Sequence, residues 1–273
     1  MKYHKKMLLL IIPSLLGVIL FYFLPFCKTF YYAVTDGTLS RRFVGMDNFI
    51  TVIGNKYYIM ALRNTLLFTA VSVSSIVIFS VVISFLLSGV KHDIYDWAFI
   101  LPVLLPTSSI ILLWRIVFGE YTDIAKALAA TGSNIIMNLP LYLIYIWKYA
   151  GFNIVLTTAA ITGIDNSIQE AAAIDGANSY VRFKFITLPL AMPVIFYTVV
   201  ISIVNSFKIF KESILLYGTP YPPDYAYTLQ YFMNNHFFKL NYHYLSSGAI
   251  IFSLIVYVIV ALAHKADKHF WNY

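Results

Sequence analysis

The strongest constraint on this chain is a set of six long apolar stretches. The clearest of them runs from Asn64 to Val90 and contains no charged side chain. A helix needs roughly 20 apolar residues to cross a bilayer. The stretches show no strand-like alternation, so their backbone hydrogen bonds are expected within helices. We therefore predict an all-α integral membrane protein with six transmembrane helices at about 7–32, 64–90, 97–114, 139–162, 188–216 and 246–263.

The composition excludes a free soluble enzyme. Of the 273 residues, 60% are hydrophobic and 11% are charged, whereas ordinary soluble domains carry about 25% charged residues. The net charge of +7 is scattered between the apolar runs, which fits basic loops at an anionic membrane surface better than a nucleic-acid site. The single cysteine of the sequence, Cys27, excludes an internal disulfide. We expect residues 1–273 to form one transmembrane domain.

The basic residues predict how the helices are oriented. The chain begins MKYHKK, as a signal peptide does, but its apolar run is longer and no small-residue cleavage site follows. We therefore expect an uncleaved first helix. Lysine and arginine are about twice as dense in segments 1–6, 89–96, 163–187 and 264–273 as in the loops between them, which is typical of cytoplasmic segments. The N- and C-termini are both predicted to be cytoplasmic.

The segment between the fourth and fifth predicted spans carries the most information. Residues 165–193 read DNSIQEAAAIDGANSYVRFKFITLPLAMP. Ser167 and Glu170 have the spacing of a capping box, and the alanines that follow favour a helix. Gly176 can end that helix in a left-handed conformation. The pattern predicts a short amphipathic helix, a turn, and a second short helix that leads into the membrane.

This segment resembles the EAA loop of the permease subunits of binding-protein-dependent ABC importers. The motif is carried by Glu170, Ala171, Ala172, Asp175, Gly176, Ala177, Ile186, Leu188 and Pro189. FVGMDNF at 43–49, the RNTLLFT run from 63 and WKYAGFN at 147–153 resemble the carbohydrate-uptake branch of the family, the MalF/UgpA type. Asp165, Asn166 and Gln169 stand where those proteins usually have a proline and a second acidic residue before EAA.

The resemblance implies a type I ABC importer permease fold in which loop 163–187 is a cytoplasmic coupling helix. Such a helix docks in a groove of the ATPase. The implied partners are a second permease subunit, two copies of a cytoplasmic ABC ATPase and an extracellular solute-binding protein. The sequence has no G-x-x-x-x-G-K-[ST] loop to hold nucleotide phosphates, so ATP and Mg are expected on the ATPase and no cofactor on this chain. The implied function is import of a sugar or oligosaccharide across the bacterial cytoplasmic membrane by alternating access.

Three polar residues within the predicted spans are candidates for the substrate path. Lys148 lies inside the fourth span, where a charge is costly and usually functional. It can instead snorkel toward the interface if that helix is displaced. Asn153 on the same helix and Asn205 on the fifth can contact a ligand, but hydrogen bonds between helices explain such amides equally well.

The acidic residues bear on the other classes of function. Glu212 is expected to form a snorkelling interfacial cluster with Lys208 and Lys211 at the outer end of the fifth span. The acids, such as Glu120, Asp123 and Glu212, lie at span ends or in loops, which argues against an ion-coupled secondary carrier. The inside loops show no catalytic dyad or metal-ligand spacing of a membrane enzyme. An anionic cargo such as a sugar acid or glycerol phosphate is the alternative to a neutral sugar, because Lys28 and Lys148 are the charged residues within the spans.

Overall fold

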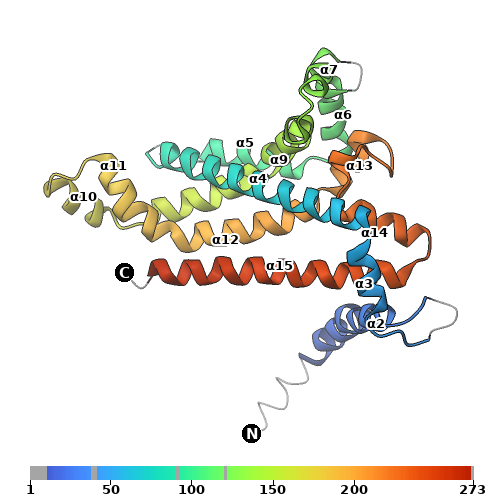
Figure 1. Cartoon of the computed structure of the whole chain (residues 1–273). Coiled ribbons are helices and arrows are strands. Elements are labelled where there is room, and N and C mark those ends of the chain that lie inside the picture. The colour runs from blue at the N-terminus through green and yellow to red at the C-terminus, as the bar shows by residue number, and fades with distance from the viewer. Residues whose placement is uncertain (1–10, 38–41, 90–92, 120–121, 272–273) are drawn as a thin grey trace, which may run out of the picture. The chain divides into compact units, whose positions relative to one another are not determined.

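The computed structural model describes residues 11–37, 42–89, 93–119 and 122–271, which are mainly helical (Figure 1). Within these ranges Thr35 and Phe43 form an isolated antiparallel β-bridge. The elements are η1 (Ile19–Phe23), α2 (Leu24–Ala33), α3 (Asp47–Gly54), α4 (Lys56–Leu87), α5 (Asp93–Leu104), α6 (Thr107–Phe118), α7 (Asp123–Ala130), α8 (Asn134–Met137), α9 (Leu139–Thr162), α10 (Asn166–Ile174), α11 (Ser179–Arg182), η2 (Phe183–Thr187), α12 (Leu188–Phe207), α13 (Phe210–Tyr217), η3 (Asp224–Ala226), α14 (Leu229–Phe238) and α15 (Tyr242–Trp271).

The contacts group the chain into two compact units. The first unit comprises residues 1–62 and 229–257, and the second comprises residues 63–228 and 258–273. The helices α4 and α15 contribute to both. Whether residues 1–273 act as one transmembrane domain stays a prediction.

In the first unit, buried polar contacts join helices that are far apart in the sequence. The Tyr58 hydroxyl on α4 donates to the carbonyl oxygen of Gly248 on α15 at 3.0 Å, and the Tyr58 ring lies 5.2 Å from that of Phe232 on α14. The Asn48 side chain donates to the carbonyl oxygen of Ala33 at 2.9 Å. Because buried polar groups need partners, these bonds fix α3, α14 and α15 against the ends of α2 and α4.

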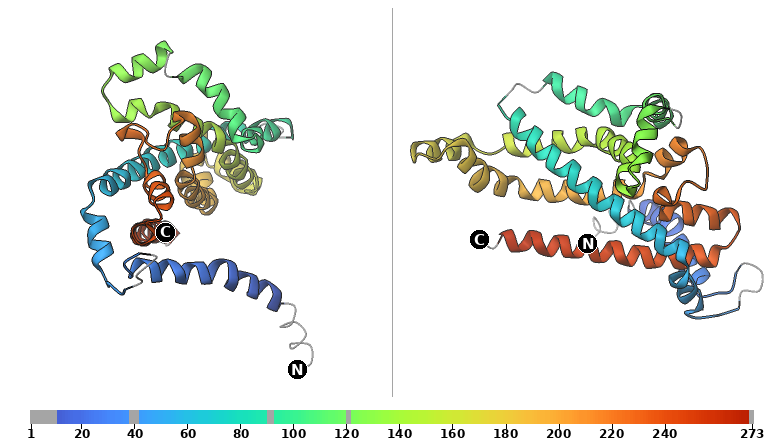
Figure 2. Two further views of the ribbon diagram at one scale, coloured as in Figure 1. Left: turned by 90° about the vertical axis from the view of Figure 1, so that its right-hand side faces the viewer. Right: turned by 45° about the horizontal axis from the view of Figure 1, so that its top comes forward.

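The second unit is built around α9, whose bounds are those predicted for the fourth span. Its core holds aromatic residues such as Phe68 and Tyr145, and the Tyr145 hydroxyl donates to the carbonyl oxygen of Ser202 on α12 at 2.6 Å. Ser84 of α4 donates to the carbonyl oxygen of Ile154 at 3.0 Å. Figures 1 and 2 show α9 and α12 side by side, with α10 and α11 beyond their ends.

The crossing of α5 and α9 depends on Gly151. A Cβ atom placed on Gly151 would lie 1.6 Å from the carbonyl oxygen of Phe99 in α5. The two backbones therefore touch at this point, as small residues allow in membrane helix pairs. Only glycine fits here.

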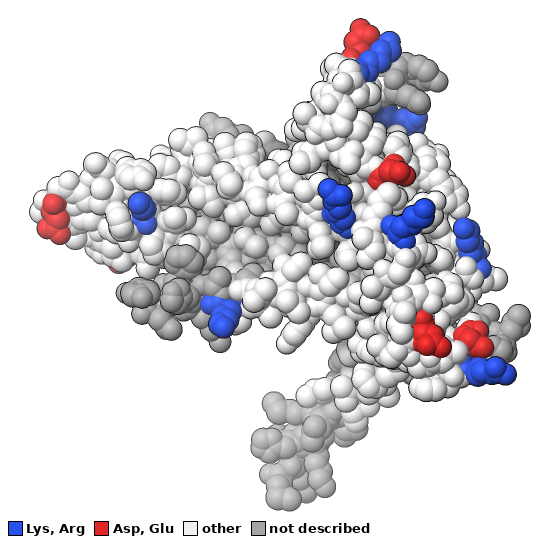
Figure 3. Space-filling view, in the orientation of Figure 1, with Lys and Arg blue, Asp and Glu red and all other residues white. Residues whose placement is uncertain are grey.

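Five helices of the described residues are long and apolar enough to cross a membrane. They are Ile11–Ala33, Lys56–Leu87, Leu139–Thr162, Ser179–Phe207 and Tyr242–Leu262. Residues 7–10 of the first predicted span and residue 90 of the second lie outside the described ranges. Over the middle of α4 and α12, the face in Figure 3 carries no lysine, arginine, aspartate or glutamate, as expected for a lipid-facing surface.

The third predicted span, 97–114, is not one straight helix. Trp97–Leu104 and Thr107–Phe118 qualify as a span only together, and they are bent by 96°. Pro106 stands at the break with φ −58° and ψ 131°. Proline cannot continue the hydrogen-bond ladder and keeps the preceding residue extended, so the helix stops and restarts.

The fifth predicted span, 188–216, is also two helices. α12 ends at Phe207, where the backbone N–H of Lys208 bonds the carbonyl oxygen of Asn205 at 3.0 Å, and α13 begins at Phe210. Lys208 stands at this break in the sequence, and the apolar residues on both sides of it favoured a span that continues through it. Because of this break, α13 does not continue the axis of α12, and Glu212 on α13 is turned inward.

Candidate functional site

α10 begins with an aspartate cap and not with the predicted capping box. The Asp165 carboxylate accepts a hydrogen bond from the backbone N–H of Ser167 at 2.9 Å, and this bond holds the pKa of Asp165 below its usual value. An acidic N-cap also complements the positive end of the helix dipole. The prediction that Ser167 and Glu170 cap each other was wrong, because the helix starts at Asn166, one residue before the expected cap.

The end of α10 confirms the prediction for Gly176. This residue has φ +85°, and its N–H donates to the carbonyl oxygen of Ala173 at 3.1 Å. The N–H of Ala177 donates to the carbonyl oxygen of Ala172 at 2.9 Å. These two bonds define a Schellman motif, in which glycine supplies the left-handed residue at low cost. The side chain of Asn178 then caps α11 through the N–H of Val181 at 2.9 Å.

A side-chain bond ties α10 to the start of α12. Gln169 Nε2 donates to the Thr187 hydroxyl at 3.1 Å. Gln169 was noted in the sequence only as a departure from the family pattern, and its spacing of 18 residues from Thr187 gave no signal of this contact. Pro189 lies in the first turn of α12, as predicted. Ile186 and Leu188 are half-buried around it.

The remaining motif residues lie on an exposed surface. Glu170, Ala171 and Asp175 are exposed on α10, and Ile168 and Ile174 add apolar surface with exposed fractions of 44% and 87%. At 87% exposure, Ile174 contributes little to packing within the described residues. Ile174 was not among the residues predicted from the sequence. It lies six residues after Ile168, a spacing that does not place the two side chains on one helix face, so the apolar pattern gave no signal for it.

Lys148 forms a buried ion pair. Its ammonium group, on a residue 8% exposed, contacts the carboxylate of Glu212, which is 2% exposed. Lys148 also donates to the Thr107 hydroxyl at 3.1 Å. Glu212 was expected in a snorkelling cluster with Lys208 and Lys211, and that expectation was wrong, because the break after α12 turns Glu212 inward. The acidic partner of Lys148 lies 64 residues away on α13.

The two asparagine candidates are placed differently. Asn153 is 1% exposed and donates to the Ser202 hydroxyl at 2.8 Å, so it joins α9 to α12. Asn205 is half-buried on the same helix as Ser202. The structure thus brings Asn153 and α12 together inside the fold and leaves Asn205 with a partly open surface.

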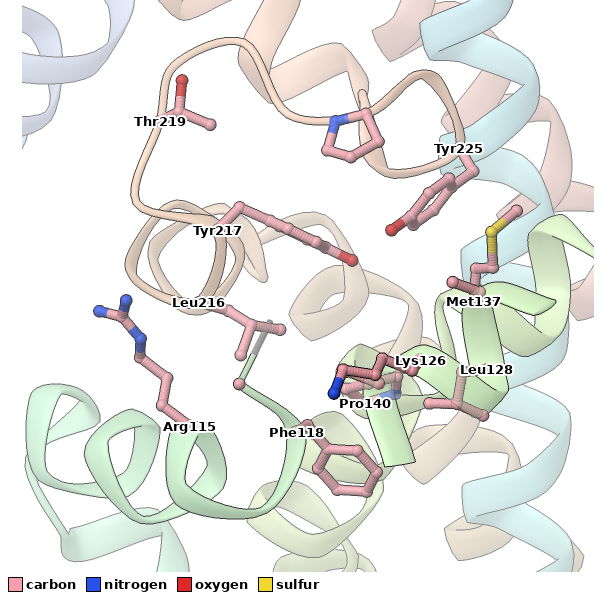
Figure 4. A pocket seen from close by; sticks show the side chains of 14 residues that line it. Arg115, Phe118, Lys126, Leu128, Met137, Pro140, Leu216, Tyr217, Thr219 and Tyr225 are labelled. Carbon is pink, nitrogen blue, oxygen red and sulfur yellow. The ribbon is translucent and has the colours of Figure 1, made fainter. Parts of the chain in front are cut away.

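A cavity of about 470 Å³ lies at the end of the second unit away from α10. Figure 4 shows Arg115 and Lys126 facing it together with the rings of Phe118, Tyr217 and Tyr225. Burial raises the pKa of the Tyr225 phenol, so this group stays a neutral hydrogen-bonding residue. Cations, hydroxyls and aromatic faces in one cavity suit a polar ligand with apolar ring faces.

Comparison with known proteins identifies the family. A family model described as "Binding-protein-dependent transport system inner membrane component" matches residues 7–270. The arabinooligosaccharide transport permease AraP of Bacillus subtilis (strain 168) is 29% identical over 267 residues, covering 92% of this chain and 84% of that protein. The sn-glycerol-3-phosphate transport permease UgpA of Escherichia coli O6:K15:H31 is 31% identical over 215 residues, covering 73% and 72%.

Another relative and a solved structure agree with this. The lactose transport permease LacF of Rhizobium radiobacter is 25% identical over 278 residues, covering 95% of this chain and 93% of that protein. The crystal structure of a bacterial ABC transporter involved in alginate import contains a chain with a TM-score of 0.81 at 20% identity, covering 98% of this chain and 96% of that one. This chain therefore belongs to the binding-protein-dependent transport system inner membrane components, and its multi-pass helical fold is that of an ABC importer permease.

Proposed function

We propose that this chain is a permease subunit of an ATP-driven importer that moves a carbohydrate across the cytoplasmic membrane by alternating access. The observation that carries the proposal is α10, a capped helix at the end of α9 and α12 on which Ile168 and Ile174 are exposed. The relatives named for arabinooligosaccharide and lactose transport support carbohydrate as the cargo class. This chain works with a second permease subunit and an extracellular solute-binding protein.

The coupling role belongs to residues 163–187 and the start of α12. Ile174 inserts into a groove of a cytoplasmic ATPase, of which two copies serve the transporter, and Glu170 makes a charged contact at its rim. The Schellman turn at Gly176 and the bond between Gln169 and Thr187 keep α10 from moving independently of α12. Motion of the ATPase dimer therefore reaches the membrane helices. ATP and Mg bind to the ATPase, and this chain does no catalysis.

The substrate path is formed with the second permease along the polar face of α9 and α12. Asn205 is the direct candidate for cargo contact, since its side chain is partly open. Asn153 and Lys148 support that face from inside the fold and do not contact the cargo directly, because their polar atoms already have partners within the chain.

An anionic cargo is the second candidate, and the cavity in Figure 4 favours it. Arg115 and Lys126 both line that cavity, and a guanidinium group such as that of Arg115 suits a carboxylate or phosphate ester. One relative is named for sn-glycerol-3-phosphate transport. Calorimetric screening of the cognate binding protein with neutral oligosaccharides, sugar acids and glycerol phosphate distinguishes the two. Tight binding of an unrelated class of solute would refute both.

The coupling role is tested by the substitution Ile174→Glu. Losing a central apolar anchor costs about 2 kcal/mol or more of binding free energy. This loss weakens the binding of the ATPase to the permease by a factor of roughly 30. Ile124→Glu is the matched control, because Ile124 is also an exposed isoleucine, at 47%, but on α7. We expect the ATPase to be lost on co-purification only for Ile174→Glu, with binding-protein-stimulated ATP hydrolysis in proteoliposomes falling in parallel. Equal behaviour of the two variants would refute the assignment of α10.

The orientation is tested by cysteine labelling. In a variant without Cys27, a membrane-impermeant reagent added outside should label a cysteine at Asp224 and spare one at Ser179. Both positions are exposed, so accessibility depends only on the side of the membrane. The reverse pattern would place α10 outside and overturn the coupling role with it.

A further inference from the structure

A second cavity lies beside α10 and α11, where two membrane spans end. Its volume is about 410 Å³. The residues that line it include Ser88, directly after α4, and Thr162, the last residue of α9, together with Ser179 and Arg182 of α11. Figure 1 shows this end of the second unit, with α10 and α11 beyond α9 and α12. The cavity therefore opens at the depth where a bilayer changes from acyl chains to headgroups.

Arg182 has donors in this cavity that the chain does not satisfy. Its Nε atom is enclosed and has no hydrogen-bond partner among the described residues. Its Nη2 atom reaches the Ser179 hydroxyl only at 3.5 Å. Among the residues that the structure describes, none that lines the cavity is an aspartate or glutamate. An enclosed charged donor without an acceptor is costly, and the described residues offset the guanidinium charge only through the long contact to Ser179. That contact is exposed, so Nη2 is the atom that an acceptor from outside the chain can reach.

The other walls of the cavity indicate what that acceptor is attached to. Phe85, Ile161 and Phe183 supply an apolar wall, and the amides of Asn166 and Gln169 add polar groups near Arg182. The Phe85 and Phe183 rings lie 4.5 Å apart. A small inorganic anion would leave this apolar wall uncovered. A molecule with a phosphate at one end and acyl chains at the other would cover both walls.

We propose that this cavity binds the headgroup of an anionic phospholipid, with its phosphate paired to Arg182. Basic pockets between membrane helices are typical sites for such headgroups. The bound lipid contacts α4, α9 and the segment that carries α10. If the proposed coupling role holds, the lipid also steadies the segment through which the ATPase acts. Lipid binding itself depends only on the cavity and the spans.

The test measures lipid retained by the complete transporter. The transporter, purified with its partner subunits in detergent and exposed to a mixture of phosphatidylglycerol and phosphatidylcholine, is analysed by native mass spectrometry. Since Arg182 supplies the charged hydrogen bond, Arg182→Gln should retain about tenfold less phosphatidylglycerol than the wild type. Arg182→Lys keeps the charge and should retain most of it. The matched control is Lys184→Gln, which removes an exposed cation two residues away that lies over the Phe185 ring.

If the transporter with Arg182→Gln fails to assemble, a second variant tests the same cavity. Ser88→Phe fills the cavity from the end of α4 without removing the charge and should lower retention to a similar extent. Unchanged retention in Arg182→Gln, or equal losses in Arg182→Gln and Lys184→Gln, would overturn the site.

Two further outcomes would identify a different occupant. If inorganic phosphate displaces phosphatidylglycerol completely at millimolar concentration, the cavity is a site for a free anion. If phosphatidylglycerol binds to the permease pair but leaves when the ATPase is added, a carboxylate of the ATPase occupies it. Either result overturns the lipid proposal. Neither bears on the cargo, because the measurement involves no transport.

Discussion

Replacing Lys148 by methionine should destabilise the chain far more than any exposed lysine would. The substitution removes the partner of Glu212, a carboxylate 2% exposed whose Oε2 atom already has no hydrogen-bond partner among the described residues. Breaking a buried ion pair on one side costs about 3–5 kcal/mol, because the other charge stays buried. By comparison, the exposed pair of Lys126 and Asp123, 3.4 Å apart, should contribute about 0–1 kcal/mol.

The double variant Lys148→Met, Glu212→Leu should recover most of the loss. Exchanging a whole buried pair for apolar side chains of similar volume is often neutral or stabilising. For a chain of this size, about 2–4 °C of melting temperature corresponds to 1 kcal/mol. We therefore expect Lys148→Met to lower the melting temperature by roughly 10 °C and the double variant to restore it. The control Lys126→Met should shift it by no more than about 4 °C.

The assay is thermal unfolding of the transporter in detergent, followed by size-exclusion fluorescence, together with uptake in proteoliposomes. A loss in the double variant equal to the sum of the two single losses would show that the residues are not coupled. It would refute the ion pair as a stabilising contact. Uptake adds a second distinction. If melting is restored in the double variant but transport is not, Lys148 and Glu212 serve the substrate path as well as the fold.

Three further outcomes are expected from the backbone and the caps. Gly176→Ala should cost about 1–2 kcal/mol locally through its φ of +85° and lower stimulated ATP hydrolysis, with normal membrane insertion on fractionation; wild-type hydrolysis would contradict this. Gly151→Ala should lower the melting temperature through the clash with Phe99, at about 1–3 kcal/mol or more, whereas an unchanged value would refute the close contact. The lowered pKa of Asp165 means that its cap stabilises α10 above the ordinary aspartate pKa, about 3.9, and is lost as the pH falls through the folded value. The protection factors of the α10 amides, which correct for the intrinsic slowing of exchange in acid, should therefore fall at low pH in the wild type and much less in Asp165→Asn.

Hydropathy predicted the helices well where one helix fills one span. The fourth span was predicted at 139–162, the bounds that α9 has. The breaks were missed, because hydropathy averages over residues and a break depends on one or two of them. Proline is a known cause of helix bending, but neither the stop of the helix at Pro106 nor the angle of 96° follows from the sequence alone.

The coupling segment was predicted in more detail than the interior. Gly176 acts through its own backbone and near neighbours, so the sequence pattern was sufficient to predict its conformation. Glu212 was misplaced because its partner is 64 residues away and its burial depends on where α12 ends. Ile174 was missed for a different reason, since an apolar residue in a membrane protein attracts attention only when the fold leaves it exposed.

The close approach of α5 and α9 has a genetic consequence. Every missense change that one nucleotide can make in a glycine codon introduces a side chain, so each one at position 151 meets the same obstacle. The atom it meets is the carbonyl oxygen of Phe99, 1.6 Å away, which belongs to the main chain and is therefore retained whatever residue stands at 99. A selection for revertants of a Gly151 mutant should thus yield true reversion, or second-site changes that displace one whole helix. Changes at codon 99 alone should not appear among them.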